Sequence, residues 1–352
     1  MRVLAIGSDR NIAHAASASA QRQIAYGMRF GDLRIIVFSL ESQRLATYAL
    51  SVETHVYPTA STWRTLYGWS AFWIARKLPK PDVVTVQDPF ETGLIGWIIA
   101  RWHGTAFHVQ VHTDLCAPAF RKLTLLNRVR VLIAGFVVRR ADRIRVVSSR
   151  IKEDIEAVYA PRAPITVLPI YVDLARFKNA RADGAGRFSK FKTKFLLVSR
   201  LEKEKNVMLA IESFAQAPQD ACLIILDGGR EKNKLQARAA KLGIAGRVFF
   251  EGRQDPAAYY ALADLVLVPS HFEGYGLVII EALAAGTPVL ATDVGVAREA
   301  GAIITSPENF ADALSAWIEN GERVGRLAEY PYTSFDAYAD AYVADIGGKN
   351  VT

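Results

Sequence analysis

Short apolar runs alternate with amphipathic stretches along most of the chain, which predicts strands alternating with helices. Strands are predicted at residues 2–6, 34–38, 83–86, 107–111, 144–147, 195–199, 222–226, 248–250, 265–268 and 289–291. Helices are predicted at 13–26, 92–102, from 150 onward, at 235–242, 277–285 and 310–320, and within 332–346. Apolar strands that alternate with helices usually pair in parallel and are covered on both faces, so the sequence predicts an α/β fold.

The chain is long enough for two domains, and one stretch is suited to join them. Residues 178–192 (KNARADGAGRFSKFK) are polar and contain glycine, which is typical of a linker. We therefore expect an N-terminal domain at residues 1–177 and a second domain at 193–330. Residues 331–352 form the remainder and carry apolar and aromatic positions at helical spacing.

The segment VPSHFEGYGLVIIEALAAGTPVLAT, residues 268–292, contains the candidate chemistry. A glycine-bearing turn at residues 273–276 precedes the predicted helix, which Gly286 and Pro288 end. A helix start presents backbone N–H groups and a positive dipole end, which favour a bound phosphate. Glu273 and Glu281 are separated by seven residues. Beside a phosphate, these carboxylates suit sugar and ribose hydroxyls, and a nucleotide-sugar offers all three groups. The alternative is an ordinary strand–helix–strand unit with surface acids.

This segment resembles the signature of retaining glycosyltransferases of family 4, written P-S-x-x-E-G-F-G-L-x-x-x-E-A-x-A-x-G-x-P-V. The matching residues are Pro269, Ser270, Glu273, Gly274, Tyr275, Gly276, Leu277, Glu281, Ala282, Ala284, Gly286, Pro288 and Val289. The resemblance implies the GT-B fold, in which two Rossmann-like domains face each other across a cleft. It also implies that the last residues, 331–352, form a helix that crosses back to the N-terminal domain.

The resemblance further implies the reaction. A hexose of the mannose or glucose type would move from a GDP- or UDP-linked donor to a glycan or lipid-linked acceptor, in cell-envelope or exopolysaccharide synthesis. The anomeric configuration would be retained by front-face attack, with the leaving phosphate taking the acceptor proton. No cofactor is implied, and the chain has no Asp-x-Asp motif, so we expect transfer without a metal.

Further site residues follow from the resemblance. Arg200 and Lys205 match an R-L-x-x-x-K element whose two cations hold the donor diphosphate, while the alternative is a solvated charged turn. The turn residues Gly274, Tyr275, Gly276 and Leu277 would complete the donor site together with Glu273 at the sugar and Glu281 at the ribose. Arg253, after the strand at 248–250, is a candidate on the base side.

The first half offers fewer candidates. His112 follows a predicted strand, where ligands of open α/β sheets bind, and the resemblance places such a histidine near the donor sugar. A turn histidine without a ligand is the alternative. Gly7 and Ser8 follow the first strand and are acceptor-side candidates, although the family's Gly-Gly pair is missing there and Gly7 can be a simple turn residue.

Charge and tryptophan are concentrated in the first half. Residues 1–180 hold 24 Lys and Arg against 13 Asp and Glu, a net of +11, whereas the whole chain carries +8. Five of the six tryptophans lie between residues 63 and 102, and residues 121–152 contain ten basic residues and one acid. A basic amphipathic helix with nearby tryptophan favours docking on an anionic membrane surface. Core packing of the tryptophans is the alternative, and no nucleic-acid motif is present.

The chain lacks a predicted signal peptide or spanning segment, and Cys116 and Cys222 lack metal-ligand spacing. We therefore expect a cytoplasmic protein that is peripheral on the inner face of the cytoplasmic membrane. Two rival functions remain: a sugar-nucleotide epimerase or phosphorylase of the same fold, and a non-catalytic nucleotide-sugar-binding protein.

Overall fold

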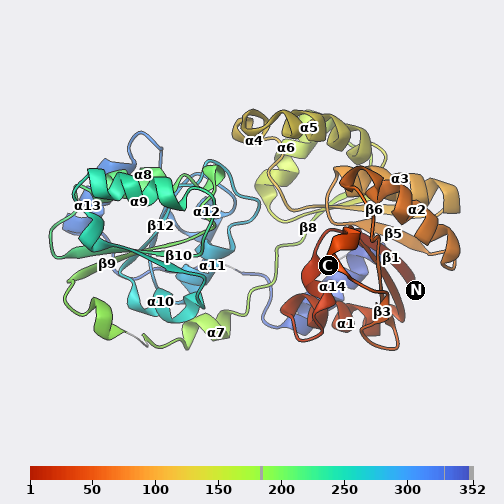
Figure 1. Cartoon of the computed structure of the whole chain (residues 1–352), viewed down its shortest axis with the longest axis horizontal. Coiled ribbons are helices and arrows are strands. Elements are labelled where there is room, and N and C mark those ends of the chain that lie inside the picture. Colours follow the sequence, from red (N-terminus) through yellow and green to blue (C-terminus); the bar gives the residue numbers. More distant parts are fainter. Residues whose placement is uncertain (183–184, 329, 349–352) are drawn as a thin grey trace. The chain divides into compact units, whose positions relative to one another are not determined.

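The computed structural model describes residues 1–182, 185–328 and 330–348, and the chain divides into two compact units. Unit 1 comprises Met1–Pro169 and the chain from Tyr332 onward, and unit 2 comprises Ile170–Pro331 (Figure 1). Residues 170–177, expected at the end of the first domain, and the expected linker 178–192 are thus grouped with unit 2. Among the described residues, no helix is both long and apolar enough to cross a bilayer.

Unit 1 is built on an eight-stranded sheet with the order β3-β4-β2-β1-β5-β6-β7-β8. Its strands are β1 (Arg2–Gly7), β2 (Asp32–Val37), β3 (Tyr48–Ala49), β4 (Thr54–Pro58), β5 (Val83–Val86), β6 (Ala106–Val111), β7 (Arg143–Val146) and β8 (Ile165–Val167). The short edge strand β3 pairs antiparallel with β4, and the other pairs are parallel. The central strands are almost fully buried, as the near-continuous apolar runs predict.

The helices of unit 1 divide between the two faces of this sheet. They are α1 (Ala18–Phe30), α2 (Tyr67–Lys77), α3 (Glu91–His103), α4 (Pro118–Leu123), α5 (Leu125–Val138), α6 (Ser149–Tyr159) and α14 (Phe335–Gly347). Side chains alternate across a strand. On β5 and β6, Val86 and Phe107 therefore face Gly96 of α3, whereas Thr85 and His108 face α14.

Helix α14 joins unit 1 although the sequence of unit 2 separates it from the rest of that unit. It packs against α1, where the rings of Tyr26 and Tyr342 have centroids 4.5 Å apart. Arg29 of α1 forms ion pairs with Asp336 at 2.6 Å and Asp340 at 2.7 Å. The helix begins at the cap Ser334 and ends at Gly348, and the expected helix that returns to the N-terminal domain is confirmed.

Unit 2 contains a parallel six-stranded sheet with the order β11-β10-β9-β12-β13-β14. Its strands are β9 (Thr193–Val198), β10 (Ala221–Leu226), β11 (Val248–Gly252), β12 (Leu265–Val268), β13 (Val289–Thr292) and β14 (Ile303–Thr305). Its helices are α7 (Leu174–Lys178), α8 (Val207–Phe214), α9 (Lys232–Lys241), α10 (Pro256–Leu262), α11 (Leu277–Ala284), α12 (Ala297–Ala300) and α13 (Phe310–Asn320). Strand order reverses between β9 and β12, which is the position at which open α/β sheets usually bind ligands.

The predicted α/β class and the two Rossmann-like sheets are confirmed. The sequence pattern did not predict β3, β4, β8, β14, α2, α7, α8 or α12. The helix expected at 13–26 is a short 3-10 turn at Arg10–Ala13 followed by α1. The basic stretch after residue 118 is also broken, because Thr124 ends α4 and its side chain caps α5.

Candidate active site

The loops that follow β9 and β12 come together at the point where strand order reverses in unit 2. β9 and β12 are neighbouring parallel strands, so the loops that follow them leave the sheet at the same edge. The first loop contains Arg200 and a 3-10 turn at Lys203–Lys205, and the second contains the turn at residues 273–276. His271 donates its backbone N–H to the carbonyl of Glu204 at 2.8 Å, which fastens the two loops to each other.

Lys205 and Glu273 form an ion pair between these loops. The ammonium Nζ lies 2.6 Å from Oε1 and 2.7 Å from Oε2 of Glu273, and both side chains are more than four-fifths buried. Ser270 donates its hydroxyl to the same Oε1 at 2.8 Å. The carboxylate therefore has a fixed orientation, and a cation that can bind an anion is held beside it. The structure thus brings together two residues that are 68 positions apart.

Helix α11 begins directly after this carboxylate. Gly276 caps the helix with φ of +93°, a left-handed conformation that glycine adopts without strain. The first turn of any α-helix leaves N–H groups without partners inside the helix, and here Leu277 is partly exposed at that end. Tyr275 is buried, and its carbonyl accepts from the N–H of Val296 at 2.9 Å. Tyr275 can therefore offer backbone rather than its ring to a ligand.

The loop after β13 supports the turn from behind. At Gly295, whose φ is +50°, an added Cβ would lie 2.4 Å from the Tyr275 carbonyl oxygen and 3.1 Å from Cβ of Glu273. No side chain fits in that space, so a glycine is required for the loop to approach so closely. Val296 is buried and anchors the turn through its backbone N–H.

Glu281 lies within α11 and is only partly accessible. Its Oε2 accepts a 2.8 Å hydrogen bond from the hydroxyl of Tyr260 on α10. Burial raises the pKa of Glu281 above its usual value, although the Tyr260 hydrogen bond and the nearby charge of Arg176 act in the opposite direction. One oxygen of this carboxyl is thus oriented by protein, which is suited to hold a ligand hydroxyl on the other.

Arg200 and Arg253 are less constrained. Arg200 lies on the same loop as Lys205. Its guanidinium is largely exposed and contacts the carboxylate of Glu204 at 3.2 Å, whereas Lys205 contacts Glu273. The backbone around it is fixed, because the N–H of Leu201 donates to Gly228 at 2.9 Å. Arg253 is exposed after β11, and β10 lies between that strand and β9.

In unit 1, Gly7 lies at the end of β1 and His112 lies just after β6, and β5 runs between these two strands. Gly7 ends β1, and the side chain of Gln87 occupies the space that a Cβ would take there. Ser8 is exposed beyond it. His112 follows β6 directly and its Nε2 lies 3.2 Å from Oε1 of Gln110. Burial, followed by the charge of Arg145, lowers the pKa of His112 to about 3, so the ring is neutral.

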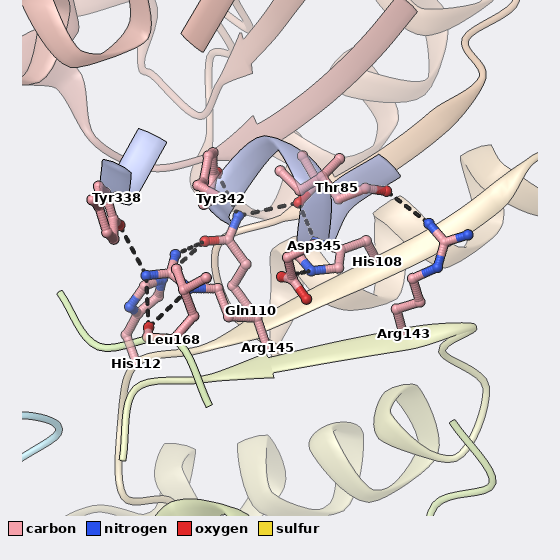
Figure 2. Close-up of polar contacts among 11 residues, drawn as sticks. Thr85, His108, Gln110, His112, Arg143, Arg145, Leu168, Tyr338, Tyr342 and Asp345 are labelled. Carbon is pink, nitrogen blue, oxygen red and sulfur yellow. Dashed lines mark hydrogen bonds and ion pairs between the residues drawn. The ribbon is translucent and has the colours of Figure 1, made fainter. Parts of the chain in front are cut away.

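A buried polar network extends from His112 to α14 (Figure 2). Its members are Thr85, His108, Gln110, Arg145, Tyr338, Tyr342 and Asp345. Sequence reasoning missed this network, and it also missed the support that Ser270 and Tyr260 give to the two carboxylates. Ser270 stood within the quoted signature, so its place three residues before Glu273 was the available signal.

Two family models match the chain. The model described as "Glycosyl transferases group 1" matches residues 182–333, and the "Glycosyl transferase 4-like domain" matches residues 17–170. The first range contains both loops that meet at the Lys205–Glu273 ion pair. The second contains His112 and its neighbours on β6 and β7.

Curated relatives agree with these matches. A D-inositol 3-phosphate glycosyltransferase of Nocardia farcinica is 30% identical over 285 residues, which cover 72% of this chain and 62% of the relative. An alpha-monoglucosyldiacylglycerol synthase of Streptococcus pneumoniae is 28% identical over 229 residues, which cover 60% of this chain and 51% of the relative. The chain thus spans less than two thirds of the length of these relatives.

Solved structures share the fold at low sequence identity. The crystal structure of Anabaena Alr3699/HepE in complex with UDP-glucose superposes with a TM-score of 0.70 at 18% identity, over 98% of this chain and 95% of that one. The match includes the two-sheet architecture on which the loops of the candidate site are placed. The likeness to solved structures shows the GT-B fold, and the two family models, which together match most of the chain, show that it belongs to the glycosyl transferases group 1.

Proposed function

We propose that this protein transfers a hexose from a nucleotide-diphosphate sugar to a glycan or lipid-linked acceptor. The observation that carries the proposal is the Lys205–Glu273 ion pair, held between two loops at the start of α11. An ammonium beside a helix start is suited to a diphosphate, and a carboxylate beside it is suited to sugar hydroxyls. Family membership supports this assignment of the residues.

The proposed chemistry needs charge stabilisation at one place. As the bond between the anomeric carbon and phosphate breaks, negative charge develops on the diphosphate. Lys205, Arg200 and the first N–H groups of α11, from Gly276 and Leu277, would stabilise that charge, and donors that are already oriented are the most effective. Gly274 would allow backbone to approach the donor. Glu281 would accept from the ribose hydroxyls, with Tyr260 holding its orientation.

Glu273 would accept from sugar hydroxyls and stabilise positive charge on the anomeric carbon. We propose retention of configuration by front-face attack, with the leaving phosphate taking the acceptor proton and with no metal involved. UDP is the favoured nucleotide, since a similar structure was solved with UDP-glucose. A GDP-linked donor is the alternative. Arg253 remains a candidate on the base side, and Gly7, Ser8 and His112 remain candidates on the acceptor and sugar side.

A donor screen tests the proposed activity. We expect one UDP- or GDP-linked hexose to raise the melting temperature of the full chain, because a ligand that binds only the folded state stabilises it. The same donor, labelled in the sugar, should give a glycosylated product when acceptors are supplied. Stabilisation without turnover would indicate a non-catalytic binding protein, and conversion of the donor alone would indicate an epimerase. Stabilisation by no nucleotide-sugar would contradict the proposal.

One surface of unit 1 supports a second proposal, docking on an anionic membrane. Helices α2, α3 and α5 pack side by side and leave apolar side chains exposed, here called the α2–α3–α5 surface. These residues are Trp69, Trp73, Ile98, Trp102, Leu125, Leu126, Val129 and Leu132. Arg121, Lys122 and Arg128 are exposed beside them. In an interfacial helix, tryptophan and leucine side chains enter the acyl boundary while basic residues contact the lipid headgroups, and this surface has the same pattern.

The structure reduces the charge that such docking can use. Arg145, counted with the basic stretch in the sequence, is buried, and Arg130 forms an ion pair with Glu91 at 2.9 Å. Each basic residue that remains near an anionic leaflet contributes roughly 1 kcal/mol. The exposed leucines Leu125 and Leu132, each about three-quarters accessible, therefore carry much of the proposed affinity.

Vesicle sedimentation tests the docking proposal. We expect the protein to bind phosphatidylglycerol vesicles at low salt and to be released by high salt, because charge attraction is screened. Changing Leu125 and Leu132 together to serine should weaken binding at least tenfold, by roughly 1.5 kcal/mol or more of lost burial. Met28→Ser, on α1 with α14, is the matched control and should bind like the wild type. Equal binding by both variants, or none at low salt, would contradict the proposal.

A further inference from the structure

The side chain that contacts His112 belongs to Gln110, two residues earlier on β6. Its oxygen Oε1 is shared by two partners: Nε2 of His112 at 3.2 Å and the guanidinium Nη1 of Arg145 at 2.8 Å. In Figure 2 the Gln110 amide lies below α14, and the contacts from His112 and Arg145 meet at its oxygen. The state of the histidine therefore depends on which end of the Gln110 amide lies at this place.

Arg145 decides the orientation of that amide. A guanidinium has donors and no acceptor, so the amide atom that faces it must be the oxygen. The amide nitrogen then lies on the other side, where it donates to the hydroxyls of Thr85 at 3.1 Å and Tyr342 at 3.0 Å. Both amide protons have partners in this orientation, and a flipped amide would oppose donor to donor.

Arg145 is itself held in place. It is 2% exposed, and its Nε and Nη2 groups donate to the carbonyl of Leu168 at 3.2 and 3.0 Å. Nη2 also donates to the hydroxyl of Tyr338 on α14 at 2.9 Å. A buried guanidinium with several donors engaged has little freedom to rotate, so the oxygen of Gln110 stays where Arg145 fixes it.

The protonation of the histidine ring follows from this arrangement. The Gln110 oxygen only accepts, so the ring nitrogen beside it, Nε2, must carry the proton. The pKa of His112 is lowered to about 3 by burial, then by the charge of Arg145 and by His108. The ring therefore carries no second proton at neutral pH, and Nδ1 has a lone pair available as an acceptor.

We propose that Gln110 and Arg145 are positioning residues that hold His112 as the neutral tautomer protonated at Nε2, so that Nδ1 presents an acceptor to a hydroxyl group of the bound sugar or acceptor. Only the identity of the hydroxyl rests on the proposed function. The tautomer is a property of unit 1 by itself, and it extends the expectation for His112 to two residues that the sequence did not single out.

Helix α14 supplies further residues that hold Gln110, Arg145 and His108 in place. Thr85 accepts from Gln110, and its hydroxyl oxygen also lies 2.8 Å from Nδ1 of His108, whose Nε2 lies 3.0 Å from Asp345. The ionisable groups of the surrounding network are Arg145 of β7, His108 of β6, and Tyr338, Tyr342 and Asp345 of α14. The histidine at the end of β6 is thus oriented by residues from the last helix of unit 1.

Nitrogen-15 NMR of the histidine side chains in the full chain tests the proposal, with His112→Gln used to assign the signals. We expect Nε2 of His112 to give the signal of a protonated nitrogen and Nδ1 that of a bare one. Both signals should stay unchanged from about pH 5 to pH 8, a range in which an unperturbed histidine titrates. A signal averaged between tautomers, a proton on Nδ1, or titration within that range would overturn the proposal.

Gln110→Glu provides the kinetic arm. A carboxylate beside Nε2 favours the imidazolium, so the pKa of His112 should rise and the charged ring should lose its acceptor. Below its new pKa, kcat/KM should fall about tenfold per pH unit, a limb absent from the wild type. Asp345→Asn, at the far end of the network, should lower the melting temperature and leave the His112 signal unchanged. A wild-type pH profile for Gln110→Glu would count against the proposal.

A failure of the proposed function can be distinguished from a failure of the positioning role of Gln110 and Arg145. If the NMR signals are as expected but no nucleotide-sugar is turned over, the tautomer stands and the proposed function fails. If transfer occurs while the ring of His112 exchanges tautomers, the proposed function stands and the positioning role fails. Should Gln110→Glu not fold, the wild-type spectrum alone decides.

Discussion

Replacing Lys205 with alanine is expected to lower kcat/KM for sugar transfer by about 10²- to 10³-fold, the usual effect of removing one oriented group that stabilises developing negative charge. The ammonium of Lys205 lies 2.6 Å from Glu273, at the start of α11, and its side chain is mostly buried. A charge that is partly removed from water interacts more strongly with a diphosphate than an exposed one. Initial rates with labelled donor, together with a donor titration by calorimetry, measure the loss.

Lys203→Ala is the matched control for this variant. Lys203 lies on the same 3-10 turn, two residues away, and its side chain is exposed. The two variants remove the same charge from the same loop, so a general electrostatic effect would lower activity equally in both. We expect Lys203→Ala to retain activity within about threefold, since exposed charges are screened. Full activity of Lys205→Ala would contradict the assignment of the site.

Replacing Glu273 with glutamine is expected to lower kcat/KM by about 100-fold or more, the effect of small misplacements in a reacting site. Both carboxylate oxygens contact Lys205, and Oε1 also accepts from Ser270 at 2.8 Å. An amide offers one acceptor and two donors, so it cannot satisfy the ammonium and the hydroxyl as the carboxylate does. The variant also removes the negative charge proposed to stabilise the anomeric carbon. Steady-state kinetics at saturating donor measure this loss of activity.

Glu299→Gln controls for the loss of a carboxylate elsewhere in unit 2. Glu299 lies on α12, and its side chain is exposed. Urea unfolding of both glutamine variants should show cooperative transitions, which excludes a loss of fold as the cause of low activity. If Glu273→Gln transferred sugar as fast as Glu299→Gln, the carboxylate would have no part in the reaction and the proposed role of Glu273 would fail.

Much of unit 2 could be predicted from the sequence because its elements are local and strongly patterned. The strand at 265–268 and the helix at 310–320 were predicted to the residue. The approach of Lys205 to Glu273 follows from parallel strands that leave the sheet at one edge. Whether these residues bind a donor stays a prediction, since contacts between side chains do not identify a ligand.

Other features depend on partners that are distant in sequence. Arg145 was counted with the ten basic residues at 121–152, although it also lies within the strand predicted at 144–147. In the structure it is buried, and its partner Tyr338 is 193 residues away. Tyr260 is a similar case, because its hydroxyl meets Glu281 only once α10 and α11 are placed. Periodicity reports which face is buried and does not report what lies against it.

The late position of α14 has a consequence for how the chain is made. A ribosome adds about 5–20 residues per second, so at least several seconds separate the emergence of β7 from that of the last helix. For most of this interval the nascent sheet has all of its strands, while Arg145 and His108 lack Tyr338 and Asp345. Unit 2, whose residues are contiguous, can mature in the meantime. Unit 1 is therefore the first unit to be translated and the last to be completed.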